Sequence, residues 1–160
     1  MTPPQRWLMD AFNYPQRKSP RLRNYDYSAN NYYFITICTD QKKMIFGAPG
    51  EVNLFGLFAE KGILQIHDHF FGVKVDKFVV MPNHIHAIII LEQSAVPVTT
   101  VVGLYKSYVT KQIHSIDPNI KVWQASFHDH VIRNQRSYEK IWSYIDTNPL
   151  KWKEDCFYSE

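Results

Sequence analysis

The sequence is poor in cysteine, since only Cys38 and Cys156 occur in 160 residues. The two lie far apart and lack metal-ligand spacing, a pattern typical of reduced thiols in a cytoplasmic protein. No apolar signal region follows the initial Met1-Thr2-Pro3-Pro4. The longest apolar stretch, from Ala87 to Leu91, is far too short to span a bilayer. We therefore expect a cytoplasmic protein with no membrane partner.

Internal repeats, low-complexity tracts and interdomain linkers are also missing, so the length favours one domain. The hydrophobic content of 45% and charged content of 21% are ordinary for a globular protein. The boundaries that we expect are a basic N-terminal arm over residues 1–30, one folded domain over 31–152 and a C-terminal tail over 153–160.

The net charge of +3 is mildly basic, which is compatible with a nucleic-acid partner without requiring one. The basic residues are unevenly spread. The arm carries Arg17, Lys18, Arg21 and Arg23, interleaved with Tyr14, Tyr25 and Tyr27, and a second group comprises Lys106, Lys111, Lys121, Arg133 and Arg136. A solvated surface is the plainer explanation of such groups.

Hydrophobic periodicity predicts the element order β-α-β-β-α-β-α. Strands are expected at 32–39, 73–80, 84–91 and 125–133, and helices at 52–67, 99–116 and 137–148. The Met81-Pro82-Asn83 segment predicts a tight hairpin turn, Ser137 is the expected cap of the last helix, and Pro149 ends it. The first six elements match an α+β ferredoxin-like (RRM-like) antiparallel sheet, with the last helix appended.

A histidine pair stands at the start of the most apolar strand, in the sequence MPNHIHAIIIL. Side chains alternate along a strand, so His84 and His86 share a face, which Ile88 and Ile90 continue. Two imidazoles on one face are able to converge on a metal ion. The simpler alternative is that each histidine is satisfied by hydrogen bonds. The pairs His67/His69 and His128/His130 also alternate; the first ends a predicted helix, and the second lies on the predicted fourth strand.

The last helix carries a second candidate group. Its predicted apolar stripe comprises Tyr138, Ile141, Trp142 and Ile145. Tyr144 lies about 110° from the centre of that stripe, which predicts that it is not a core residue. Asn148 follows one turn later on nearly the same line. Tyr144 is thus a candidate nucleophile and Asn148 a candidate ligand, although a boundary aromatic and a helix end explain the pattern equally well.

Several segments, in this order, resemble the REP-associated tyrosine transposases, a branch of the single-tyrosine transposases with a His-hydrophobic-His motif. They are RLRNYDYS, YYFITICT, MPNHIHAIIIL, LYKSYVTKQI, VWQASFHDHVIRN and YIDTNP, and together they cover residues 20–152. The chain departs from the family pattern in having Tyr105 where phenylalanine is expected. It also has Asn148 where the insertion-sequence relatives have glutamine.

The resemblance implies a DNA transposase that binds hairpin DNA and cleaves and rejoins single-stranded DNA through a covalent 5′-phosphotyrosine. Tyr144 is then the nucleophile, and Mg²⁺ or Mn²⁺ is held by His84, His86 and Asn148. We favour a monomer, with a dimer as the alternative. The competing hypotheses are an inactive DNA-hairpin-binding protein, a phosphodiesterase that uses metal-bound water, and an RNA-binding domain.

Contacts with DNA are expected from basic and aromatic side chains. The cationic candidates for phosphate binding are Arg21, Arg23, Lys106, Lys111 and Arg133, and the candidates for base stacking are Tyr25, Tyr27 and Trp123.

Overall fold

The central strands of the sheet are those whose sequences are apolar on both faces. In the computed structural model, which describes residues 31–154, every residue of β5 (His84–Leu91) is buried. β5 lies between β4 (Val73–Met81) and β1 (Asn31–Cys38), and β6 (His128–Ile132) forms the other edge, giving the order β4-β5-β1-β6. All three pairings are antiparallel. This arrangement confirms the predicted α+β, ferredoxin-like sheet.

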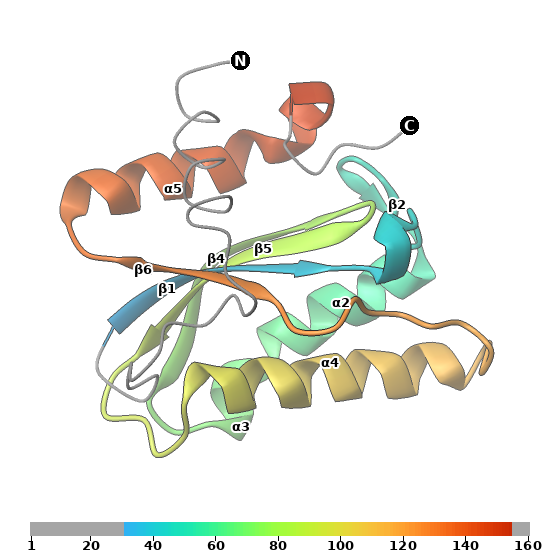
Figure 1. Ribbon diagram of the computed structural model, residues 1–160, viewed down its shortest axis with the longest axis horizontal. Helices are drawn as coiled ribbons and strands as arrows, with labels where there is room; N and C mark the ends of the chain where they lie inside the picture. The colour runs from blue at the N-terminus through green and yellow to red at the C-terminus, as the bar shows by residue number, and fades with distance from the viewer. Residues whose placement is uncertain (1–30, 155–160) are drawn as a thin grey trace.

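Helices cover both faces of the sheet (Figure 1). α2 (Leu54–Leu64) and α4 (Val98–His114) lie on one face, and α5 (Gln135–Thr147) lies on the other. Ile85, Ala87 and Ile89 belong to the core cluster beneath α2 and α4. Ile88 and Ile90 belong to the cluster beneath α5. The alternation expected along β5 therefore divides the core into two layers, and the histidines face α5.

Several predicted boundaries need correction. The first helix is shorter than 52–67: α2 begins after Asn53, whose side chain accepts a hydrogen bond from Gly56 N, and Gln65 separates it from α3 (Ile66–His69). The fourth strand begins at His128, not near residue 125. Ser137 does not cap α5; Asn134 does, because its Oδ1 accepts from Ser137 N at 2.9 Å.

A small hairpin that the periodicity missed joins β1 to α2. It pairs β2 (Gly47–Ala48) with β3 (Glu51–Val52), after a short 3₁₀ turn, η1 (Asp40–Lys42). Gly47 has φ 107° and its backbone packs so closely that an added Cβ would lie 2.6 Å from Asn53 N. Two-residue strands are too short to give a periodic signal.

The turn between β4 and β5 is held by backbone contacts as well as by its own sequence. Met81 pairs with His84, so Pro82 and Asn83 form a two-residue loop, as predicted. The Asn83 carbonyl accepts from both Thr39 N and Thr39 Oγ1, each at 3.0 Å. The start of β5 is thus fixed to the end of β1.

Residues 1–30 and 155–160 lie outside the described part of the chain, so the predicted arm and most of the predicted tail remain predictions. Within residues 31–154, no helix combines the length and apolarity needed to cross a bilayer.

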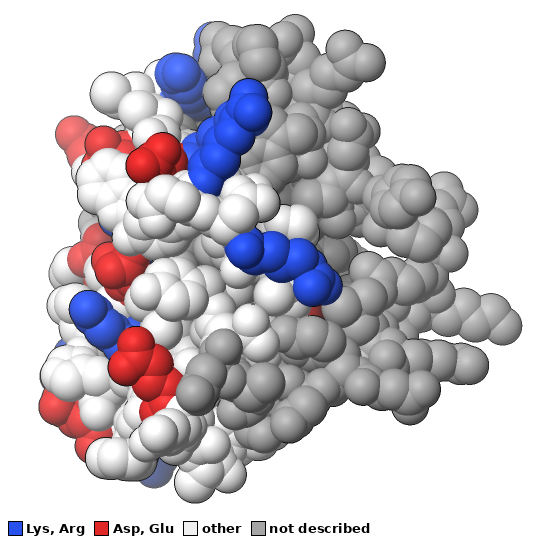
Figure 2. Space-filling view, turned by 90° about the vertical axis from the view of Figure 1, so that its left-hand side faces the viewer, with Lys and Arg blue, Asp and Glu red and all other residues white. Residues whose placement is uncertain are grey.

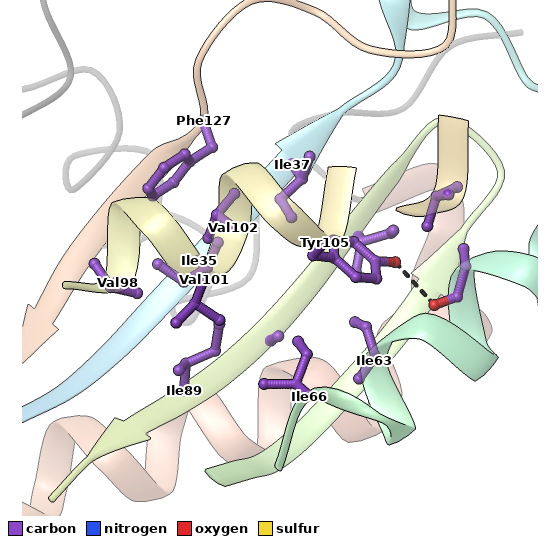
Figure 3. Packing of buried hydrophobic residues seen from close by; sticks show 14 of the residues in the cluster. Ile35, Ile37, Ile63, Ile66, Ile89, Val98, Val101, Val102, Tyr105 and Phe127 are labelled. Carbon is purple, nitrogen blue, oxygen red and sulfur yellow. Dashed lines mark hydrogen bonds between the residues drawn. The ribbon is translucent and has the colours of Figure 1, made fainter. Parts of the chain in front are cut away.

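The residue that departs from the expected phenylalanine, Tyr105, links the two helices of the larger core layer. Its hydroxyl donates to Ala59 O of α2 at 2.8 Å (Figure 3). Burial raises the pKa of Tyr105 well above 10.0, with a further contribution from Glu60, so the phenol remains a donor at neutral pH.

We expect Tyr105→Phe to lower the free energy of unfolding by about 0.5–1.5 kcal/mol, the usual contribution of one intramolecular hydrogen bond. Urea denaturation measures the change. Tyr108→Phe is the matched control on the same helix, and we expect it to stay within about 0.5 kcal/mol of wild type. Equal effects of the two variants would contradict a specific role for the Tyr105 bond.

Candidate active site between β5 and α5

The two histidines lie side by side beneath α5. Their ring centroids are 4.5 Å apart, at an interplanar angle of 69°. Both residues are 0% exposed. A buried imidazole needs hydrogen-bond partners, because an unsatisfied polar group in a protein interior costs free energy.

Both rings are held through the same atom. His84 Nδ1 lies 2.7 Å from Asn83 Oδ1, and His86 Nδ1 lies 2.8 Å from Thr36 Oγ1, on β1. An amide oxygen only accepts, so Nδ1 of His84 carries the proton and Nε2 carries the lone pair. This is the arrangement in which a histidine binds a metal ion, with its second nitrogen fixed by a neighbouring oxygen.

Tyr144 faces the second histidine. Its hydroxyl lies 3.4 Å from His86 Nε2, and its ring centroid lies 5.2 Å from that of His86. The ring also packs edge-on against Phe34, at 6.3 Å. Tyr144 is only 6% exposed, so the expectation that it lies outside the core is wrong. Trp142, which was expected in the core, is 36% exposed instead.

Asn148 follows Tyr144 by one helical turn and begins η2 (Asn148–Glu154), a 3₁₀ segment. It is 1% exposed. Trp152, in the same segment, stacks on His84 with ring centroids 6.0 Å apart. The segment that starts at Asn148 therefore covers the His84 end of the pair.

The donor atoms near this position suit a divalent cation. His84 Nε2 and Asn148 Oδ1 are buried atoms that form no hydrogen bond with the described residues, although both residues contact their neighbours through other atoms. Across residues 31–154 there is no cluster of three or more His, Cys, Asp or Glu side chains that fits a metal ion. Among the described residues, the candidate donors are therefore the two imidazoles and the neutral amide oxygen of Asn148.

Of the other two histidine pairs, one lies away from this position and the other lies on the same face of the sheet. His67 is on the surface, where it pairs with Asp68 at 3.1 Å. His128, on β6, pairs with Thr36 of β1, which in turn pairs with His86 of β5. His128 therefore lies on the same face of the sheet as His86, with β1 between them. Burial and the nearby Arg133 lower the pKa of His130, which disfavours its charged form.

The predicted DNA contacts fall into four groups. Lys111 and Arg133 are exposed, as a phosphate contact requires. Lys106 donates to Gln124 O and Ser126 O, both at 2.9 Å, so its ammonium holds the loop before β6. Trp123 is 7% exposed and its indole N–H donates to Lys106 O, so its ring is not presented to a base. Arg21, Arg23, Tyr25 and Tyr27 lie outside the described residues.

Charges of both signs are mixed on the described part of the face in Figure 2. Lys and Arg side chains stand among Asp and Glu there, with no extended patch of one sign. This face alone therefore gives no strong electrostatic signal for a nucleic acid.

Residues 27–148 match the sequence model of a family described as IS200-like transposases. The chain belongs to the IS200-like transposase family. The resemblance drawn from the histidine pair and the Tyr144 segment is thereby confirmed at the level of the family. An uncharacterized protein of Haemophilus influenzae is 32% identical over 167 residues, which cover 89% of this chain and 93% of the relative.

Two solved structures of transposases share the fold. One, described as a REP-associated tyrosine transposase bound to a REP hairpin, superposes with a TM-score of 0.64 at 20% identity. The match covers 82% of this chain and 73% of that one. The other, a candidate transposase from Deinococcus radiodurans, has a TM-score of 0.51 at 17% identity and covers 79% and 95% of the two chains.

Replacing Thr36 by valine, which has nearly the same shape, removes the hydroxyl that holds His86. We expect this transposase to lose about 1–3 kcal/mol of unfolding free energy, because a buried imidazole nitrogen would be left without its hydrogen bond. Urea denaturation measures the loss. Thr110→Val on α4 is the control, with an expected change within about 0.5 kcal/mol. A harmless Thr36→Val would mean that the bond does not hold the ring.

Proposed function

We propose that this transposase cleaves and rejoins single-stranded DNA with Tyr144 as its nucleophile. The observation that carries the proposal is the 3.4 Å separation between the Tyr144 hydroxyl and His86 Nε2, in a pair of histidines that are both held by Nδ1. Their Nε2 atoms are the atoms through which we propose that the two histidines bind a metal ion. The Tyr144 hydroxyl would then lie beside the metal, which is one way in which a weak nucleophile is activated.

His84, His86 and Asn148 would hold a divalent cation, Mg²⁺ or Mn²⁺. When bound, the cation would polarise the scissile phosphate and offset the charge that develops on its oxygens. Imidazole suits Mn²⁺ better than Mg²⁺, so Mn²⁺ is the cation that we expect to bind more tightly.

The protein's own residues carry out the rest of the reaction. The Tyr144 oxygen attacks phosphorus while the bond from phosphorus to the 3′ oxygen breaks, and the proton lost by the phenol is balanced by the proton that the departing 3′ oxygen takes up. The products are a 5′-phosphotyrosine and a strand that ends in a 3′-hydroxyl. One phosphodiester bond is exchanged for another ester, so a 3′-hydroxyl can reverse the step, and strands are joined without an external energy source. A free phenol has a pKa near 10, so attack at neutral pH needs a proton acceptor.

The DNA partner that we propose is a hairpin with an adjoining single strand. Lys111 and Arg133 are exposed cations of the described chain that suit phosphate contacts. The four site side chains are at most 6% exposed. A phosphate therefore reaches them only if a covering residue moves, and Trp152, which stacks on His84, is one described residue that covers the site.

A single chain supplies the tyrosine helix and the histidine strand, since α5 packs on β4 and β5 of its own sheet. The described residues of one chain thus bring Tyr144 and the two histidines together. We therefore propose a monomer as the active unit.

Tyr144→Phe tests the proposed function. Wild-type protein incubated with Mn²⁺ and end-labelled hairpin DNA, taken from repeats beside its own gene, should form an adduct that survives a denaturing gel. The adduct should disappear in EDTA, which removes the cation, and in Tyr144→Phe, which lacks the proposed nucleophilic hydroxyl. Tyr108→Phe, on the opposite side of the sheet, should retain it. Cleavage that persists in Tyr144→Phe would assign the chemistry to water, and binding without cleavage would leave a DNA-recognition protein.

Metal binding can be tested without DNA. We expect isothermal titration of wild type with Mn²⁺ to show one site, and His84→Gln or His86→Gln to weaken it at least about tenfold. His67→Gln, which changes an exposed histidine, should leave the affinity unchanged. Retention of wild-type affinity in both buried variants would rule out the proposed ligands.

A further inference from the structure

The edge strand that faces α5 contains a β-bulge. The pairing of β4 with β5 shifts between Val75 and Lys77, which leaves Asp76 as the extra residue. Neighbouring side chains of a regular strand point to opposite faces, but a bulge re-aims them. Two successive charged residues, Asp76 and Lys77, consequently both contact α5.

These contacts surround Tyr144 along the helix. The Tyr138 hydroxyl donates to Asp76 Oδ2, six residues before Tyr144. Lys77 Nζ lies 2.7 Å from Asp146 Oδ1, two residues after Tyr144. The same Nζ lies 4.1 Å from the ring centroid of Trp142, two residues before it. We call these three contacts the β4 latch.

The latch fits the difference between the predicted and the observed rotation of α5. The apolar periodicity favours a stripe that includes Trp142 and excludes Tyr144. In the structure Trp142 is 36% exposed beneath the Lys77 ammonium, and Tyr144 is 6% exposed. Hydrophobic burial alone does not select this rotation, since both rotations bury Ile141 and Ile145. The bond between Tyr138 and Asp76 is a directional contact that can distinguish the two rotations.

The bond between Tyr138 and Asp76 is the most directional contact of the latch. The hydrogen bond to the Asp76 carboxylate, together with burial and the nearby negative charge, raises the pKa of Tyr138 to about 12. Tyr138 therefore remains a hydrogen-bond donor at any working pH. The pair of Lys77 with Asp146 is half open to solvent and contributes little by itself.

We propose that Asp76 and Lys77 are positioning residues, which set the rotation of α5 and so hold the Tyr144 hydroxyl against His86. The inference rests on the proposed role of Tyr144 as nucleophile. Without the latch, α5 turns toward the orientation that buries Trp142, and the Tyr144 hydroxyl moves away from the histidines. A small misplacement of a reacting group slows a reaction strongly while leaving substrate binding intact.

The first test measures the reaction. We expect the double variant Tyr138→Phe/Lys77→Met to form the DNA adduct about tenfold more slowly at saturating hairpin DNA, with a Kd for that DNA within about twofold of wild type. Lys74→Met, an exposed lysine of the same strand, is the control and should react normally. In a Lys77→Asp background, adding Asp146→Lys should restore part of the rate, because it restores the ion pair in reverse.

The second test measures the rotation and needs no DNA. In protein labelled with 5-fluorotryptophan, the Trp142 fluorine signal is assigned through its loss in Trp142→Phe. Tyr138→Phe leaves Lys77 and Trp142 in place, so a change in the solvent exposure of this signal reports rotation of α5. We expect the difference in the Trp142 fluorine chemical shift between H₂O and D₂O to become smaller in Tyr138→Phe, because the ring becomes buried.

The two tests separate the two proposals. If wild type forms no adduct, the proposed function fails, and the fluorine signal alone decides whether the latch sets the rotation. An unchanged fluorine signal in Tyr138→Phe together with an unchanged adduct rate in the double variant overturns the latch. The latch is also overturned if the rate of adduct formation in the double variant falls only in proportion to its affinity for DNA, with no change in the fluorine signal of Tyr138→Phe.

Discussion

The hydrogen bonds that hold His84 and His86 through Nδ1 are the interactions on which the rest of the site depends. β5 is buried on both faces, so its two imidazoles are stable there only with polar partners. Asn83 in the adjoining turn and Thr36 on the neighbouring strand supply them. These two bonds restrain the rings through Nδ1, and Nε2 of His86 lies on the side where Tyr144 is found.

The same bonds connect the fold to the chemistry. Thr36 is opposite His86 because of the register in which β1 pairs with β5. In that register Asn31 pairs with Leu91 at one end, and Cys38 pairs with His84 at the other. A slip of one residue would turn every side chain of β5 to the other face. The carbonyl of Asn83, bonded to Thr39, holds the turn at the end of that register. The strand pairing therefore sets the position of the proposed metal ligands on β5, His84 and His86, as well as that of the sheet.

Much of this arrangement was predictable from local patterns. The alternation in HIHAIIIL predicted that the two histidines share a face of the sheet. The four-residue spacing of Tyr144 and Asn148 predicted that they lie on the same side of one helix. The rotation of α5 was not predictable, because it depends on a bulge in β4, and a bulge has no periodic signal. The partners of His84 and His86 were missed for a related reason: Thr36 is distant in sequence, and Asn83 was interpreted only as a turn residue. Trp123 was assigned to DNA on its residue type alone, whereas its ring lies among Phe46 and Tyr105.

The proposed site requires both histidines to present Nε2 to a single cation. Diffraction from crystals grown with Mn²⁺, recorded at the manganese absorption edge, would locate that cation. We expect one anomalous peak within coordination distance of His84 Nε2 and His86 Nε2, with Asn148 Oδ1 as the third protein ligand. A peak at other side chains, or an occupied site bonded through Nδ1, would contradict it.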